Sequence, residues 1–189
     1  SASPMNGPWF SIPSTHGPVD LALDTEGHGI LVWSDHDHIL GCKDIYACTS
    51  PTVIAAPGAG EAYVNPRVWS DGTDTWVVFE EFTNGIIYEV QALTTWPATP
   101  VHVGDGRFPD IHDDLIVWQG DAQDGCTWSD HEQIWFQDRS TGSVDRLVSH
   151  PTWGPMTAGR ARLTPHAVTF QLDWHNQTKR ALVTLDRSL

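Results

Sequence analysis

The amino-acid sequence predicts an all-β protein, a four-bladed β-propeller built from four-stranded antiparallel blades. Three observations predict this fold. Short apolar runs rich in β-branched and aromatic residues recur along the chain, which is typical of strands. Sixteen Gly and thirteen Pro separate these runs and leave little room for long helices. The runs also group into four units of about 47 residues, a period typical of propellers and other repeat proteins.

The third unit shows the repeat most clearly. A short strand around Phe108-Pro109-Asp110-Ile111 is followed by an apolar strand over 115–118 and an alternating strand over 133–138. A Thr141-Gly142 turn then leads into an outer strand over 145–149. Four antiparallel strands in this order form one blade of a propeller.

The same order of elements predicts a single domain over 1–189 with four blades. The blades are expected at about 18–56, 62–103, 107–149 and 160–189. Their second strands are expected at 30–33, 76–79, 115–118 and 167–170, and their third strands at 45–48, 87–90, 134–137 and 181–184. A proline is expected to open each unit, because the first residue of a strand can spare its N–H: Pro18, Pro66, Pro109 and Pro165.

The two ends of the chain predict how the ring closes. The last unit stops after its third strand, and the segment Trp9-Phe10-Ser11-Ile12-Pro13 resembles the fourth strand of the third unit. An N-terminal strand over 9–13 that completes the last blade would leave no open sheet edge. A monomer is therefore expected; a half-ring that dimerises into eight blades is the alternative.

The motif Pro109-Asp110-Ile111, with Leu115-Ile116-Val117-Trp118, Gln133-Ile134-Trp135-Phe136 and Thr141-Gly142, resembles the TolB-type β-propeller repeat of exported bacterial proteins. The resemblance extends over the whole chain in register and is strongest in the third unit. It implies a propeller in the periplasm or at the cell surface that binds a protein or another ligand. TolB-type rings usually have more blades, and in size alone the chain is similar to hemopexin-like propellers.

Charge and hydropathy exclude some classes of partner. The chain has 24 acidic and 10 basic residues, a net charge of −14, and an acidic surface repels the phosphates of nucleic acids. It contains no run of 18 apolar residues, so no membrane span is expected. The small residues that begin the chain suit a mature N-terminus after signal cleavage, or a remnant of a tag. Secretion or export to the periplasm or cell surface is expected.

Three cysteines leave the disulfide pattern open. On a straight strand, Cys42 and Cys48 would lie roughly 20 Å apart, too far for a disulfide. Cys42 and Cys126 both follow a Gly in equivalent loops, so a Cys42–Cys126 bridge is the expected pair. Three buried free thiols are the alternative.

Acidic and His residues concentrate in the loops between second and third strands. In a propeller these loops lie on the same side as the connections between blades, so four of them are expected around one channel mouth. The candidate ligand-binding carboxylates are Asp35, Asp37, Glu80, Glu81, Asp130, Glu132 and Asp173. Trp128, Trp153 and Trp174 are expected in loops of the same side, where flat rings beside carboxylates are typical of sugar-binding sites.

The same loops contain candidate metal ligands. Residues i and i+2 of an extended chain point the same way, so His36 and His38 are expected to chelate one ion, with His131 or His175 as a third ligand. Imidazole and carboxylate suit Zn or Cu. Ca is a second option at 121–125 or 71–74, where carboxylates flank a Gly turn. Solvated loop residues are the alternative to each.

The function expected from these features is that of an exported, non-enzymatic binding protein. Its acidic, His-containing loop side would bind a cation, a small molecule, a glycan or a protein. The alternative is a metal-dependent enzyme with the four histidines as ligands and a neighbouring carboxylate as base. No catalytic motif is recognised in the sequence.

Overall fold

The computed structural model describes residues 17–83, 87–121, 132–147, 156–174 and 180–187. These residues form strands, turns and loops and contain no helix, which confirms the all-β prediction. It follows that no helix suited to crossing a membrane is found in the described part of the chain.

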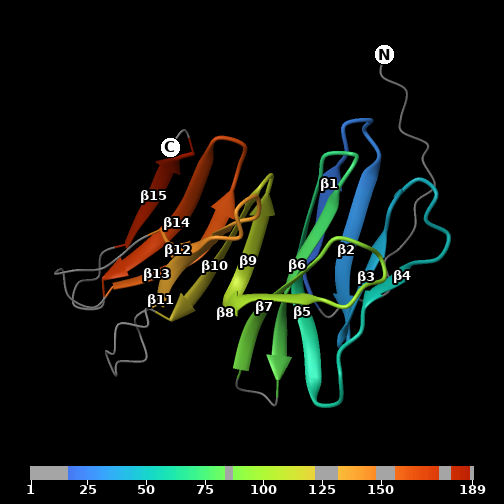
Figure 1. Ribbon diagram of the computed structural model, residues 1–189, viewed down its shortest axis with the longest axis horizontal. Coiled ribbons are helices and arrows are strands. Elements are labelled where there is room, and N and C mark those ends of the chain that lie inside the picture. Colours follow the sequence, from blue (N-terminus) through green and yellow to red (C-terminus); the bar gives the residue numbers. More distant parts are fainter. Residues whose placement is uncertain (1–16, 84–86, 122–131, 148–155, 175–179, 188–189) are drawn as a thin grey trace.

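The strands form four antiparallel sheets, which we call blades 1 to 4 (Figure 1). Blade 1 consists of β1 (Val19–Leu23), β2 (Gly29–Asp35), β3 (His38–Cys42) and β4 (Thr52–Ala55). Blade 2 consists of β5 (Glu61–Ser70), β6 (Thr75–Thr83), β7 (Ile87–Leu93) and β8 (Val101–Asp105). Blade 3 consists of β9 (Arg107–His112), β10 (Leu115–Asp121), β11 (Glu132–Asp138) and β12 (Val144–Arg146). Blade 4 has three described strands, β13 (Met156–Leu163), β14 (Ala167–Trp174) and β15 (Arg180–Asp186).

The second strand of each blade carries the core, as the apolar runs predict. Each of these strands ends its apolar run on a ring that is almost completely buried: Trp33, Phe79, Trp118 and Phe170. Side chains on the two faces of a strand alternate, so the second strands of blades 2 and 3 contact both neighbouring blades. Phe79, Trp118 and Phe170 stabilise the packing between blades, whereas Trp33 packs with Leu31 and Cys42 within blade 1.

The blades lie side by side in an arc, in the order of the sequence. The first strands line its inner side, with β1 against β5, β5 against β9 and β9 against β13. Three apolar clusters fill the spaces between blades, one around Ile39 and Val68, one around Val78 and Ile111, and one around Ile134 and Val168. Among the described strands, every extensive contact between blades therefore joins blades that are neighbours in sequence.

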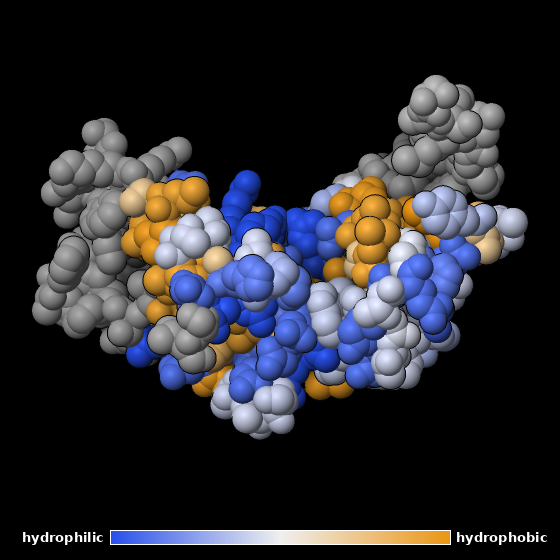
Figure 2. Space-filling view, turned by 90° about the horizontal axis from the view of Figure 1, so that it is seen from above, coloured by the Kyte–Doolittle hydropathy of each residue, from blue (hydrophilic) through white to orange (hydrophobic). Residues whose placement is uncertain are grey.

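Closure of the arc into a four-bladed ring is not confirmed. Blades 1 and 4 lie at opposite ends of the arc (Figure 1), and no extensive contact joins them among the described strands. Viewed along the strands, the molecule is a crescent with an open hollow between its two arms (Figure 2). The predicted closing strand over 9–13 lies outside the described residues.

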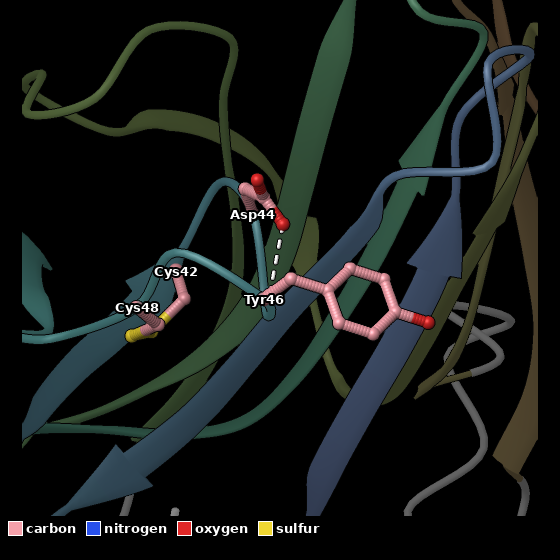
Figure 3. Close-up of a disulfide and its surroundings, with 4 residues drawn as sticks. All are labelled: Cys42, Asp44, Tyr46 and Cys48. Carbon is pink, nitrogen blue, oxygen red and sulfur yellow. Dashed lines mark hydrogen bonds between the residues drawn. A yellow bond between two sulfur atoms is a disulfide. The ribbon is translucent and has the colours of Figure 1, made fainter. Parts of the chain in front are cut away.

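The prediction for the third strand of blade 1 was wrong. Residues 45–48 form a turn, and the third strand is β3. Asp44 stabilises the turn, because its Oδ1 accepts a hydrogen bond of 2.8 Å from the Tyr46 N–H (Figure 3). The Ile45 N–H donates to the Gly29 carbonyl at 2.8 Å, so the turn folds back onto β2.

This turn also explains the disulfide. Cys42 is bonded to Cys48, with the two Cα atoms 5.7 Å apart, so the expected Cys42–Cys126 bridge was wrong (Figure 3). The straight-strand distance did not apply, because the chain reverses between the two cysteines. The bonded loop packs with Leu31 and Trp33 on the outer face of blade 1. Cys126 lies outside the described residues.

Candidate functional site

The candidate site is the hollow of the crescent, lined by the first strands of the four blades. Hydrophilic residues gather at the floor of this hollow, and hydrophobic residues lie on both arms above it (Figure 2). The strands that form this inner side are β1, β5, β9 and β13, which contact one another in that order.

A bulge recurs in three of these strands. Asn65, Phe108 and Arg160 have φ angles of 53°, 54° and 51°, and the pairing register of β5, β9 and β13 shifts around them. A proline follows the first two, so Pro66 and Pro109 lie at bulges inside strands, where an N–H is also dispensable. The prediction that a proline opens each unit was therefore wrong for these two, and Pro165 lies in the turn between β13 and β14.

Buried side chains of the preceding blade hold two of the bulges. Glu80 Oε1 accepts hydrogen bonds from the Phe108 N–H at 2.8 Å and from Asn65 Nδ2 at 2.6 Å. Gln119 Oε1 accepts from the Arg160 N–H at 3.1 Å. Glu80 is 1 % exposed, and burial raises the pKa of its carboxyl despite these two bonds. The bulges thus have defined positions, and so have the side chains that follow them.

An alternating row of charges crosses the inner side of the arc. Asp20, Arg67, Asp110 and Arg162 occupy the same register position in β1, β5, β9 and β13. Each is paired with the residue that precedes the buried ring of its own second strand. We call these four residues the charge row.

The charge row joins the blades pairwise. Arg67 Nη1 lies 3.6 Å from Asp20 Oδ1, and Arg67 Nε lies 4.0 Å from Asp110 Oδ1. The two aspartates also accept backbone N–H bonds from the next blade, Asp20 from Val68 at 2.9 Å and Asp110 from Leu163 at 2.7 Å. Burial raises the pKa of both aspartates, and the backbone bonds and arginines oppose that shift.

Two further arginines give the inner side of the arc more positive than negative charges, because the charge row itself has two of each. Arg107 and Arg160 lie against the Phe108 ring, their guanidinium carbons 5.4 and 5.0 Å from its centroid. Arg160 and Arg162 are exposed, and no carboxylate of the described residues lies within 4.0 Å of either guanidinium. The hollow therefore presents exposed guanidinium groups, although the whole chain has a net charge of −14. Guanidinium forks bind carboxylates and phosphates bidentately.

The predicted loop side is only partly described. The ends of the second strands lie together at the lower end of the arc in Figure 1, where the loops to the third strands begin. Asp35 and His38 end one such hairpin, and Tyr63 of blade 2 donates its N–H to the Asp37 carbonyl at 2.9 Å. Asp130, Trp128, His131, Trp153 and His175 lie outside the described residues, and Glu132, Asp173 and Trp174 are placed only by their strands, at the ends of β11 and β14.

The expected geometry of the two histidines was wrong. His36 has a φ of 54° and lies in the two-residue turn between β2 and β3, so His36 and His38 do not form an extended pair. The His36 side chain is 74 % exposed. The described part of the chain contains no group of three or more His, Cys, Asp or Glu side chains placed to hold a metal ion. A site that includes His131 or His175 stays a prediction.

Other predicted residues have structural partners. Glu80 belongs to the bulge described above, while Glu81, the next residue of β6, accepts a hydrogen bond of 3.4 Å from Thr83 Oγ1. Asp71, a candidate for calcium, accepts the Thr73 and Asp74 N–H groups at 2.8 and 2.7 Å through one oxygen, which closes the turn between β5 and β6.

The charge row was missed by the sequence analysis. Its signal was present, because Pro66-Arg67 and Pro109-Asp110 align directly. The other two members do not share this Pro–charge dipeptide, because Asp20 comes two residues after Pro18 and Arg162 comes before Pro165. Strand register, which includes the bulges, is what aligns all four.

Solved structures resemble this arc. No protein-family profile and no curated protein matches the sequence. An oligogalacturonate lyase in complex with manganese superimposes with a TM-score of 0.60 at 11 % identity, over 87 % of this chain and 49 % of the lyase chain. TolB from Acinetobacter baumannii superimposes with a TM-score of 0.50 at 10 % identity, over 95 % of this chain and 45 % of TolB. The chain thus spans about half the length of these structures, and the likeness confirms a β-propeller-like fold.

Proposed function

We propose that this chain is a non-enzymatic binding protein whose hollow holds a ligand that carries carboxylate groups. The exposed pair Arg160 and Arg162 carries the proposal. Both lie on the inner strand of blade 4, and the guanidinium groups of Arg67 and Arg107 lie on the neighbouring inner strands. Repulsion among like charges on an otherwise acidic protein is relieved when an anion binds between them.

A carboxylated oligosaccharide is the ligand class that we propose. A row of guanidinium groups along an open groove suits a chain with repeated carboxylates better than a single small anion. The lyase that shares the fold acts, by its name, on oligogalacturonate, a sugar chain of this chemical class. Nucleic acid is disfavoured by the net charge of −14 of the whole chain.

Calorimetric titration with a galacturonate tetramer at low salt tests this function. We expect Arg160→Ala with Arg162→Ala to weaken binding at least ~10-fold, because each charge-assisted hydrogen bond contributes about 1.5–3 kcal/mol. The matched control is Lys43→Ala with Arg146→Ala, which also removes two positive charges. Lys43 lies over the Trp96 ring and Arg146 over the Trp135 ring, both outside the hollow. It should change the dissociation constant less than about twofold. Equal binding of the fully methyl-esterified tetramer, or an unaffected double variant, would show that the hollow is not a carboxylate site.

The loop side is a second candidate for ligand contact, and its metal-dependent enzyme alternative also stays a proposal. The clustering of carboxylates and histidines in the loops supports it. Metal analysis of protein purified without chelators tests both ideas. One tightly held Zn or Cu per chain that is lost with His36→Ala and His38→Ala would support the site, and metal-free protein would contradict it.

The fourth strand of blade 4 is also a proposal. Blades 1 to 3 have four strands each, whereas β15 has no partner on its outer edge among the described residues. This free edge supports the pairing of residues 9–13 with β15. A mass of two copies per particle would contradict closure of a four-bladed ring within one chain.

Export from the cytoplasm is proposed as well. The Cys42–Cys48 disulfide supports it, because disulfides persist in oxidising compartments. Fractionation of the source cells checks the location, and a cytoplasmic protein with reduced cysteines would contradict it.

A further inference from the structure

The outer face of blade 1 carries an unpaired apolar strip. Leu21 in β1 occupies the register position that Val68 has in β5 and Ile111 has in β9. Val68 and Ile111 are 6 % and 5 % exposed because the preceding blade covers them, whereas Leu21 is 52 % exposed. Val19 and Leu23 flank it on the same face of the strand and are 39 % and 63 % exposed.

The outer face of blade 4 shows the same feature at the other end of the arc. Leu182 in β15 occupies the register position that Ile39 has in β3 and Ile134 has in β11. Both isoleucines are 0 % exposed under the following blade, whereas Leu182 is 76 % exposed. Each end of the arc therefore exposes an apolar residue at a position that is covered by a neighbouring blade elsewhere in the repeat. Figure 2 shows hydrophobic residues on both arms of the crescent.

The charge row gives these two ends complementary charges. It alternates in sign from blade to blade, beginning with Asp20 on blade 1 and ending with Arg162 on blade 4. A next blade would continue the alternation only if it presented an acidic residue at this position. Blade 1 of a second copy presents Asp20 there, which continues the alternation.

We propose that two copies of this chain join head to tail, with blade 4 of each copy against blade 1 of the other. Four blades from each copy then close one ring, and both apolar end faces are covered.

The face of blade 4 makes this interface partly polar. Thr169 and Thr184 lie opposite each other beside Leu182, at positions where blade 3 has Val117 and Phe136. A mixed face of this kind is typical of reversible association rather than of an obligate dimer. The mass is therefore measured over a range of concentrations.

Sedimentation velocity or light scattering of the full chain tests the pairing. The expected mass is twice 20.9 kDa at high concentration, falling toward 20.9 kDa on dilution. Leu21→Asp is expected to raise the dissociation constant at least ~30-fold, as expected for a central apolar contact. Val144→Asp is the matched control, because Val144 is 45 % exposed on the outer strand β12 of the interior blade 3, away from both end faces. It should leave the mass unchanged.

A mixture of two variants tests the head-to-tail arrangement. Leu21→Asp blocks only the blade 1 face, and Leu182→Asp blocks only the blade 4 face, so each alone should be monomeric. Mixed together, they should form a two-copy species, because one unaltered blade 4 face then meets one unaltered blade 1 face. Both residues are exposed, so each variant should unfold at the temperature of the wild-type monomer.

Several results would overturn the proposal. A wild-type mass of 20.9 kDa at every concentration means that the end faces are covered within the chain or left open. An effect of Leu21→Asp alone, with none from Leu182→Asp, means that blade 1 pairs with blade 1. Species larger than two copies mean an open filament. The masses are measured without carbohydrate, so the outcome is independent of the proposed ligand.

Discussion

Replacement of Trp118 by Ala should lower the free energy of unfolding by about 3–5 kcal/mol, as is typical of deleting a buried ring. Trp118 is 2 % exposed and packs between blades 2 and 3. Its indole Nε1–H donates to the Asp105 carbonyl at 3.2 Å. The ring lies so close to Gly104 that a Cβ there would come within 2.6 Å of Trp118 Cζ2. Gly104 therefore leaves the room that the indole ring occupies.

Urea unfolding followed by tryptophan fluorescence and circular dichroism checks this value. Trp118→Phe retains most of the buried ring but not the hydrogen bond, and it should cost only about 1 kcal/mol. Tyr46→Ala is the exposed control, because Tyr46 is 63 % exposed, and its effect should stay within about 0.5 kcal/mol. A loss of less than 1 kcal/mol in the Ala variant would mean that the two blades do not depend on this ring.

Glu80→Ala should destabilise the protein by about 3 kcal/mol at pH 7, because it leaves two part-buried donors without their acceptor. These donors are the Phe108 N–H and the Asn65 amide, both bound to the same carboxylate oxygen. Glu80→Gln keeps an acceptor oxygen and removes the charge, so it should cost less than about 1 kcal/mol. A similar loss in both variants would mean that the charge itself holds the bulge.

The two variants also separate a pH effect. Burial raises the pKa of Glu80 in the folded protein above the ordinary value of 4.5, so the folded state binds a proton more readily than the unfolded state. The stability due to this proton is fully present below pH 4.5 and is lost as the pH rises through the folded pKa. Wild-type protein should therefore lose stability relative to Glu80→Gln as the pH rises from 4.5 to 7. Parallel pH curves for the two proteins would contradict the raised pKa.

The strands with strong periodicity could be predicted from the sequence, because their burial follows from residue type. The runs that end at Trp33, Phe79, Trp118 and Phe170 all lie in second strands with buried rings. The third strand of blade 1 could not be predicted from residue type. Ile45 and Tyr46 have high strand propensity, but Asp44 and the disulfide favour a turn there.

The candidate site was much harder to predict. The charged loops stand out in the sequence, whereas the charge row is scattered singly through apolar strands. Its members come together only through the strand register, which the bulges at Asn65, Phe108 and Arg160 shift. Side-chain type alone does not reveal such a shift, because the bulge depends on backbone conformation and on acceptors in the preceding blade.

Extensive contacts between blades join only sequence neighbours in the described part of the chain, and this has a consequence for folding. Such a protein behaves as a one-dimensional array, in which stability is the sum of unit and nearest-neighbour terms. Structure can then nucleate at any adjacent pair of sheets and spread outward, and local opening begins with fraying at the terminal sheets. The interior blades 2 and 3, each held on two sides, form the most persistent part of the molecule.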